Sequence, residues 1–365
     1  MKPPLAGIKI ADFSRVLAGP YATMLLADLG AQVIKIERPG IGDDTRTWGP
    51  PFDKNGNATY FLSVNRNKES LELDLTNTAD QLIANDLIAS SDVVVENFGP
   101  GGMERYNLGY SQLIANNPKL IYCSISGFGT SEKASSLPGY DLLLQGMSGL
   151  MSVTGSDENN PTKVGVALVD VITGLHAVVG ILAALRVRDE QGVGQKVELN
   201  LLSSTLSALV NQASTYLSAG VIPKAMGNAH PSIAPYQVFE AKDKKFIVAV
   251  GSDQQFTKFA GVVKPELLAD KRFATNQLRV QNLEQLNAEL NPVFIQQTAD
   301  YWISTLAKVK IPAGSINNVK EAFDLAQSLG LNSVVEIEGV KSVANPITFS
   351  KTPVEYRVPP PNLKG

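Results

Sequence analysis

Short apolar runs alternate with longer helical patterns along the N-terminal half of this chain. The segments "GIKIADFS" (7–14) and "QVIKIERP" (32–39) have the composition of buried strands, and "AGPYATMLLADLGA" (18–31) between them is typical of a helix with Pro20 in its first turn. The helix-then-strand order returns in "ADQLIANDLIASSDVVVENF" and "SQLIANNPKLIYCSISGFG", and "QKVELNLL" adds a further strand. Because strands joined through helices run parallel, the sequence predicts an α/β fold with a doubly wound parallel sheet.

The character of the sequence changes after about residue 205. The segment "QVFEAKDKKFIVAVGS" predicts an antiparallel hairpin that turns at Lys242–Lys244, and "EIEGVKSVANPITFSKT" has a strand pattern. Helical patterns lie between them, at 254–263, 282–297 and 299–309. We therefore expect a large α/β domain (1–205 with 325–365), a linker (206–224) and a smaller α+β domain (225–320).

Charge and cysteine content narrow the classes of partner. The 365 residues carry a net charge of −3, which gives no reason to expect nucleic acid or an anionic membrane as the main partner. An anionic ligand must then be held by a few well-placed cations. The single Cys123 cannot form an intramolecular disulfide, and its apolar setting in "LIYCSISGFG" predicts a buried, inert thiol. With "MKPPLAGIKIADF" lacking a signal-peptide pattern and no uninterrupted apolar run near about 18 residues, we expect a soluble cytoplasmic protein.

Three familiar chemistries find no support. The first turn reads "DFSRVLAGP" instead of G-x-G-x-x-G, so it does not predict a nicotinamide site. No serine lies in a G-x-S-x-G elbow, which argues against an α/β-hydrolase. Two histidines and one cysteine far apart in sequence provide no recognisable zinc ligand set, and His176 and His230 are better interpreted as a core and a loop residue.

An acid stands inside the apolar stretch "KVGVALVDVITGLHAVVGILAALRVRD" (163–189). Asp170 has Leu168 and Val169 before it and Val171 and Ile172 after it. Burying a carboxylate among such neighbours is costly unless something binds it or it performs chemistry. At this strand–helix junction an aspartate is also a favoured N-cap. The residues alone leave both interpretations open.

Seven stretches together resemble one known family. They are "LAGIKIADFSRVLAGPYATMLLADLGAQVIKIERPGIGDDTR", "YFLSVNRNKESLELDL", "SDVVVENFGPGGMERYNLGY", "NPKLIYCSISGFG", "VGVALVDVITGLHAVVGILAAL", "GNAHPSIAPYQVF" and "ANPITFSKTPVEY". In order and spacing the chain is similar from end to end to the family III CoA-transferases. The resemblance implies an interlaced homodimer in which each chain passes through a ring formed by the other.

The resemblance also implies a mechanism. Asp170 matches the family's catalytic nucleophile, which attacks an acyl-CoA thioester to give a mixed anhydride. The released CoA thiolate then forms an aspartyl thioester, and an acceptor acid takes over the CoA through a second anhydride. The partners implied are an acyl-CoA and a free carboxylic acid. No metal and no cofactor beyond CoA as a substrate is expected.

CoA contacts are implied at positions that match the family. They are Val16, Leu17, Ala18, Arg38, Leu73, Thr76, Asn97, Phe98, Gly99, Arg105 and Tyr140. Thr76 is a departure, since related sequences can place a lysine there against the CoA phosphates, and Lys68 and Arg66 are candidate replacements. Gly227, Asn228 and Ala229 match a glycine-rich loop over the active site, although only Gly227 is glycine here. The family's final helix is not expected after "PPPNLKG".

The same fold hosts α-methylacyl-CoA racemases, which are the alternative. Racemases resemble "G-H-D" where this chain has Gly139-Tyr140-Asp141, and they need an acid/base group on each face of the substrate carbon. A tyrosine with an ordinary pKa of about 10 replaces histidine poorly in that role. Tyr140 therefore favours CoA transfer, and Asp141 is expected to be structural or to support Asp170. The sequence names neither the acyl donor nor the acceptor acid.

Overall fold

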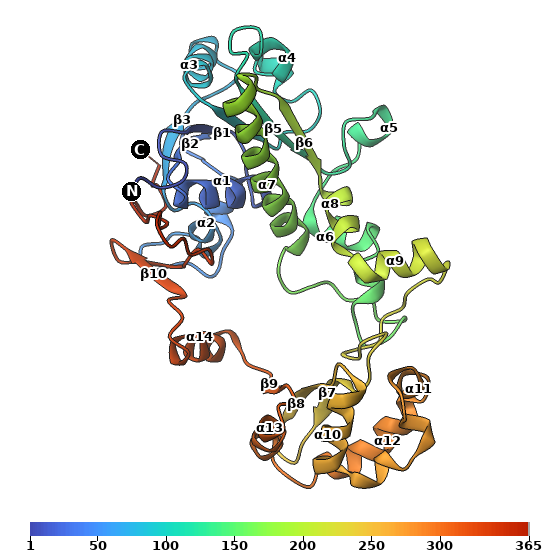
Figure 1. The fold of residues 1–365 in the computed structure, drawn as a ribbon. Coiled ribbons are helices and arrows are strands. Elements are labelled where there is room, and N and C mark those ends of the chain that lie inside the picture. The colour runs from blue at the N-terminus through green and yellow to red at the C-terminus, as the bar shows by residue number, and fades with distance from the viewer. Residues whose placement is uncertain (364–365) are drawn as a thin grey trace. The chain divides into compact units, whose positions relative to one another are not determined.

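The computed structural model describes residues 1–363 and contains the predicted parallel sheet (Figure 1). Its strands are β1 (Lys9–Asp12), β2 (Gln32–Glu37), β3 (Lys68–Glu72), β4 (Val93–Glu96), β5 (Ile121–Ser126) and β6 (Lys196–Asn200). They pair in the order β3-β2-β1-β4-β5-β6, and every pair is parallel. The chain therefore builds outward in opposite directions from β1 and from β4. The crevice beyond the carboxyl ends of such a pair is where doubly wound sheets bind ligands.

Helices cover both faces of this sheet, with α1 and α7 on one face and α3 and α4 on the other. The helices of this unit are α1 (Ala18–Asp28), α2 (Thr59–Ser63), α3 (Thr78–Ala89), α4 (Tyr110–Leu113), α5 (Glu132–Ser135), α6 (Asp141–Met147), α7 (Leu168–Gln191), α8 (Leu201–Ala208) and α9 (Val210–Ala219). Shorter 3₁₀ turns are η1 (Asp44–Thr47), η2 (Glu104–Tyr106) and η3 (Met151–Val153). Alternate residues of one strand serve the two cores: Ile10 packs with α1 and α7, and Ala11 packs with α3. The predicted doubly wound α/β fold is confirmed.

Among the described residues one helix, α7, is long and apolar enough to cross a membrane by length and composition. The uninterrupted apolar runs of the sequence did not indicate this. In the fold its buried residues, Ala177 and Ile181 among them, pack in the core with α1 and the sheet. Gly174 lets the two helices approach closely, because a Cβ there would lie 2.7 Å from the carbonyl oxygen of Ala18. The helix thus serves as the core helix of this unit.

A buried ionic network ties the end of the chain to the end of α1. Asp28 accepts from Arg66 Nε at 3.0 Å and from Arg66 Nη2 at 2.6 Å. The same carboxylate accepts from the side-chain amides of Asn67 and Asn345 at 2.8 and 3.1 Å. Arg357 donates to the carbonyl oxygens of residues 27 and 31, where the last turn of a helix favours a cation. The C-terminal segment is thereby fixed against α1.

The chain forms two compact units. The first holds Met1–Met151, Lys163–Ile222 and the described residues from Gly330 on, and the second holds Ser152–Thr162 and Pro223–Leu329. Residues 206–222, which we expected in a linker, include α9 and belong to the first unit. The first unit also contains the antiparallel strands β10 (Val334–Ile337) and β11 (Val340–Val343). The bounds also differ from the predicted domains at a second place. Residues 152–162 belong to the second unit, although they lie far from 223–329 in sequence.

The second unit is built on a three-stranded antiparallel sheet. Its elements are β7 (Tyr236–Glu240), β8 (Lys245–Ala249), β9 (Ala313–Ser315), α10 (Asp253–Val263), η4 (Pro265–Leu268), η5 (Lys271–Phe273), α11 (Asn276–Gln281), α12 (Leu283–Phe294), α13 (Ala299–Lys308) and α14 (Val319–Ser328). The β7–β8 hairpin and the helices expected near 254–263, 282–297 and 299–309 are confirmed. Phe246 and Trp302 contact the ring of Phe294 at the centre of its core.

We expect the substitution Asp28→Ala to lower the free energy of unfolding by about 3–5 kcal/mol, because it leaves the buried Arg66 guanidinium without its carboxylate. Urea unfolding followed by circular dichroism measures this. Asp86→Ala removes an exposed carboxylate on α3 and is the control, with an expected change within about 0.5 kcal/mol. Equal unfolding midpoints for the two variants would contradict the proposed contribution of the Asp28 network to stability.

Candidate active site

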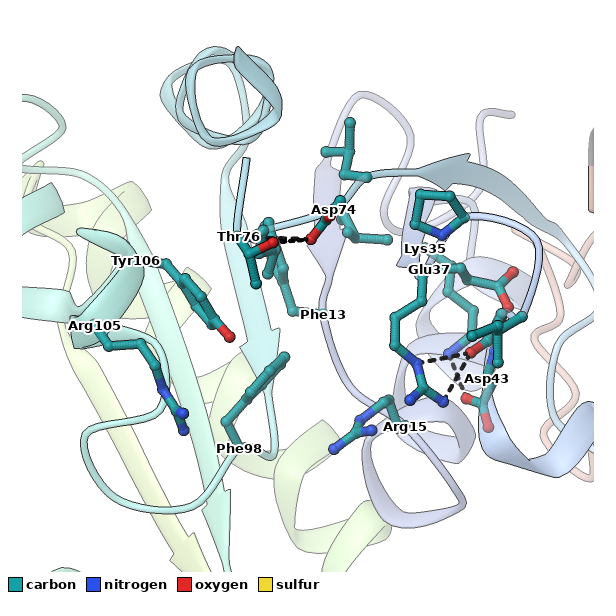
Figure 2. A pocket seen from close by; sticks show the side chains of 17 residues that line it. Phe13, Arg15, Lys35, Glu37, Asp43, Asp74, Thr76, Phe98, Arg105 and Tyr106 are labelled. Carbon is teal, nitrogen blue, oxygen red and sulfur yellow. Dashed lines mark hydrogen bonds and ion pairs between the residues drawn. The ribbon is translucent and has the colours of Figure 1, made fainter. Parts of the chain in front are cut away.

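Two adjoining cavities open at the carboxyl ends of the parallel strands. The first cavity, of about 510 Å³, is lined by residues that follow β1, β2 and β3 together with Phe98 and Arg105. The second cavity, of about 400 Å³, is lined by residues that follow β1, β4 and β5 and by Asp170. Arg15 and Phe98 line both. Figure 2 shows the first cavity, with Arg105 and Tyr106 on one side and Arg15, Lys35 and Asp43 on the other.

The structure brings the sequence-predicted contact residues of the first unit to these two cavities. The first cavity receives Arg38, Leu73, Thr76, Phe98 and Arg105. The second receives Val16, Leu17, Ala18, Asn97, Phe98, Gly99, Tyr140 and Asp170. Residues separated by more than a hundred positions meet because every one of them follows a strand or begins a helix at the same edge of the sheet. Their contact with CoA stays a prediction.

The turn between β1 and α1 is held from two sides. The side-chain amide of Asn97, just after β4, accepts from Arg15 N at 2.8 Å and donates to Arg15 O at 2.7 Å. The next residue, Val16, has a φ of 69°, which is a strained conformation for a β-branched residue. Lys35 is fully buried beneath this turn, where its Nζ donates to Ser14 O at 2.8 Å. The turn is thus fixed in a shape that the chain would not adopt by itself.

Asp170 is not the N-cap of α7, so that interpretation is wrong. The helix begins at Leu168 after Ala167, which makes no side-chain cap, and residues 163–167 form no strand. The cap comes instead from Asp141, at the start of α6. Asp141 Oδ1 accepts from Val169 N at 2.9 Å and from Asp170 N at 3.4 Å. The carboxylate of Asp170 is therefore not used to cap the helix.

Asp141 is itself held in place by its surroundings. Gln145 donates to Asp141 Oδ2 at 2.7 Å and accepts from Val164 N at 2.8 Å, which joins α6 to the approach of α7. Gly127 after β5 lies against Gly139, and a Cβ on Gly127 would come within 2.6 Å of the Cα of Gly139. This close backbone contact sets the start of α6 beside the end of the sheet. The expectation that Asp141 supports Asp170 agrees with this geometry.

Burial and a neighbouring charge perturb the acid. Loss of hydration, and then the negative charge of Asp141, raise the pKa of Asp170 to about 7. Burial, with Asp170 as the next cause, raises the pKa of Tyr60 to about 12, so its phenol stays protonated. A carboxyl group whose pKa lies near neutrality, in a cavity and beside a specific charge, is a candidate functional group.

The two cations proposed to replace a lysine at Thr76 do not reach the cavities. Lys68 is fully buried, and its Nζ contacts Asp12 Oδ2 at 3.1 Å and Pro20 O at 2.9 Å. Arg66 is bound to Asp28 in the network described above. Thr76 donates its hydroxyl hydrogen to Asp74 Oδ1 at 2.7 Å. That expectation was wrong because the sequence did not reveal which charged side chains are buried.

Arg15 is the cation that the sequence analysis missed. It lies in the first turn, directly before Val16, and its guanidinium lies 5.5 Å from the centre of the Phe98 ring. It lines both cavities, although the residues after it in "RVLAG" were the ones singled out. The signal that could have found it is its place at the end of β1, where the strand order reverses.

The loop residues Gly227, Asn228 and Ala229 lie in the second unit. Gly227 has a φ of 62°, and its N–H donates to Gly155 O at 3.0 Å. Asn228 and Ala229 line a separate cavity of that unit, between the hairpin and α12. Their predicted role as a cover over the active site stays a prediction. Cys123 is fully buried in the sheet, and burial raises the pKa of its thiol, as expected of an inert residue.

Comparison with known proteins identifies the family. The family model described as CoA-transferase family III matches residues 5–365. The chain belongs to this family. The succinyl-CoA:glutarate CoA-transferase of Mus musculus is 43% identical over 99% of this chain and 84% of its own. The succinate–glutarate CoA-transferase of Agrobacterium fabrum is 40% identical over 99% of this chain and 93% of its own.

Solved structures agree with this family. A CaiB/BaiF family protein from Brucella suis has a TM-score of 0.89 at 43% identity, covering 100% of this chain and 97% of its own. A Mycobacterium tuberculosis protein has a TM-score of 0.90 at 28% identity, covering 99% and 98%. The sequence-based family and fold are confirmed, and the enzyme is a family III CoA-transferase acting on an acyl-CoA and a carboxylate. The relatives from Mus musculus and Agrobacterium fabrum are named CoA-transferases, so they give the racemase alternative no support.

The raised pKa of Asp170 has a consequence for stability. In the unfolded chain its pKa returns to about 3.9, so between pH 4 and 7 the unfolded state releases a proton that the native state keeps, and the wild type loses stability as pH rises. Asp170→Asn has no such proton to release. We expect this variant to unfold at a higher urea concentration than the wild type above pH 7, with the gap shrinking toward pH 4. A variant less stable than the wild type at pH 8 would contradict this.

Proposed function

We propose that Asp170 is the nucleophile of the CoA-transfer reaction. The observation that carries this proposal is a partly buried carboxylate with a pKa of about 7 that lines the second cavity while another residue caps its helix. A carboxylate that has lost part of its hydration shell attacks a carbonyl carbon more readily than a fully hydrated one.

The proposed reaction has four steps that balance without a net proton. The Asp170 carboxylate attacks the thioester carbonyl, the C–S bond breaks, and a mixed anhydride and CoA thiolate form. The thiolate then attacks the Asp170 carbonyl carbon, releasing the donor acid and leaving an aspartyl-CoA thioester. The acceptor carboxylate attacks that thioester, its C–S bond breaks, and a second anhydride and CoA thiolate form. The thiolate finally attacks the acceptor carbonyl and frees Asp170. Because no step changes oxidation state, we propose CoA as a substrate and no redox cofactor.

We infer that CoA occupies both cavities. The guanidinium groups of Arg38 and Arg105 in the first cavity suit the phosphates, because arginine binds phosphate oxygens with paired donors. The thioester end must reach Asp170 in the second cavity. The shared walls formed by Arg15 and Phe98 support one elongated ligand that spans both.

We propose dicarboxylic acids as the acyl group and the acceptor. Relatives at about 40% identity are named for succinyl-CoA and glutarate, each of which carries a second carboxylate. Arg15 is the one basic side chain among the described residues that line the second cavity, so it is the available partner for such a group. Mass spectrometry of the CoA thioesters formed from succinyl-CoA and a panel of labelled mono- and dicarboxylic acids tests this.

A homodimer is also proposed. Large apolar side chains are exposed on three helices of the first unit: Leu142 and Met147 on α6, Leu175 and Val179 on α7, and Val210 and Leu217 on α9. Exposed apolar patches of this kind mark protein–protein contacts. We expect a mass of twice the 39.0-kDa chain in light scattering. A monomer in dilute solution would contradict the proposal.

Asp170→Asn should reduce turnover of succinyl-CoA and labelled glutarate by several orders of magnitude while the protein stays folded, because the amide is not a nucleophile. In the wild type, incubation with acyl-CoA followed by hydroxylamine should modify the peptide containing "VALVDVITG" at Asp170. The same treatment of the Asn variant is the control. If that variant kept more than a few per cent of the wild-type rate, Asp170 would not be the nucleophile.

Asp141→Asn should shift the pH dependence of kcat/KM. The reacting form of Asp170 is the carboxylate, so the rate rises with pH through its pKa of about 7. Removing the negative charge of Asp141 lowers that pKa, and the acidic limb moves to lower pH. Asparagine keeps the Oδ1 acceptor for Val169 N, so the helix cap remains. An unmoved limb in a folded variant would show that Asp141 does not act on Asp170.

A further inference from the structure

One carboxylate, that of Asp44, joins two arginine side chains at the boundary of the two cavities. Asp44 Oδ1 lies 2.5 Å from Arg38 Nη2, and Asp44 Oδ2 lies 3.2 Å from Arg15 Nη1. Arg38 lines the first cavity, Asp44 lines the second and Arg15 lines both. The three side chains are 37–47% exposed, so their contacts are open to solvent and to a ligand.

Four of the other charged side chains along the first cavity or beside it already form ion pairs with one another. Lys35 and Asp43 form a fully buried pair at 2.8 Å. Glu37 binds Arg46 at 2.6 Å, and the Arg46 side chain is largely buried. The cations that face the first cavity with exposed donors are therefore Arg15, Arg38 and Arg105, the last of which donates to Gly102 O at 3.1 Å. Asp44 engages two of these three.

Asp44 is separate from the buried network beneath it. It is the first residue of η1, and the preceding Asp43 caps that turn by accepting from Thr45 N. The recorded contacts of the Asp44 carboxylate are with the two guanidinium groups. Its charge is thus not needed to hold η1 together, and its position against the two cavity-lining arginines needs another explanation.

A carboxylate in this place competes with a phosphate. Each guanidinium presents its planar donors to one anion at a time on a given edge, and Asp44 occupies an edge of both. When a phosphate arrives, it must either displace Asp44 or bind within a few ångströms of its negative charge. Both alternatives weaken binding, and both act on the bound substrate and product alike.

We propose that Asp44 is a built-in counter-ion that occupies Arg38, a phosphate-binding arginine, and the adjacent Arg15 in the empty enzyme and thereby limits its affinity for CoA thioesters. This rests on the proposed function, in which the CoA phosphates bind at Arg38 and its neighbours. Substrate and product both carry CoA, so a site without this competitor would hold the product thioester as tightly as the substrate. Asp44 therefore sets how readily the product leaves.

The test is the affinity of the full-length protein for free CoA, measured by titration calorimetry. Asp44→Asn keeps the side-chain size and one acceptor oxygen but removes the charge. We expect its Kd for CoA to be about two- to fivefold lower than that of the wild type, the size of an exposed ion pair. The gain should be largest at about 0.01 M salt and vanish at about 1 M, where the Debye length is about 3 Å. The KM for the acyl-CoA should fall in parallel.

Two controls separate the outcomes. Asp86→Asn removes an exposed carboxylate on α3, outside the cavity lining, and should leave the Kd unchanged. Arg38→Ala should raise the Kd if the phosphates bind here. Suppose that Arg38→Ala binds CoA more weakly than the wild type, while folded Asp44→Asn and Asp44→Ala bind it no more tightly. That result would overturn the proposed role of Asp44 and leave the proposed CoA site intact. A wild type and an Arg38→Ala variant that bind CoA equally would overturn the site as well.

Discussion

The reversal of strand order between β1 and β4 is the constraint on which the rest of this structure depends. Two parallel strands that continue to opposite sides of the sheet must leave their following turns diverging from a common edge. The side chain of Asn97 joins those turns by hydrogen-bonding both the N–H and the C=O of Arg15. The two cavities lie on either side of this junction. The residues around it therefore keep a fixed spacing although they come from distant parts of the chain.

Buried ion pairs support this edge of the sheet, whereas the carboxylate of Asp170 has no cation paired with it among the described contacts. The pairs Lys68–Asp12 and Lys35–Asp43 are fully buried and complete, and they brace the turn that carries the strained Val16. Asp170 has the opposite environment, since burial opposes its ionisation and the charge of Asp141, which also acts on it, is of the same sign. A fold tolerates such a group only where its surroundings are held rigidly by other interactions.

The fold could be predicted largely from local pattern. Strands β1 and β2 and helix α1 lie where the sequence placed them, because their apolar residues alternate with the period of a strand or of a helix. The site was harder to predict. Arg66 and Lys68 are indistinguishable from surface cations in sequence, yet both are buried in ion pairs, and Arg15 was overlooked beside the residues that follow it. Exposure of a charged side chain is decided by distant packing, which no local pattern records.

The sequence by itself determined the doubly wound sheet, the family and the position of the unusual acid, because strand and helix periods and ordered motifs are properties of the chain alone. Only the tertiary structure decided that Asp170 is not a helix cap. That role belongs to Asp141, which lies 29 residues earlier and reaches α7 because Gly127 and Gly139 allow two backbones to touch. It also decided that Asp44 faces two arginines. A hydrogen bond or an ion pair between distant residues requires the whole fold to bring its atoms within about 3 Å, and sequence spacing does not encode that distance.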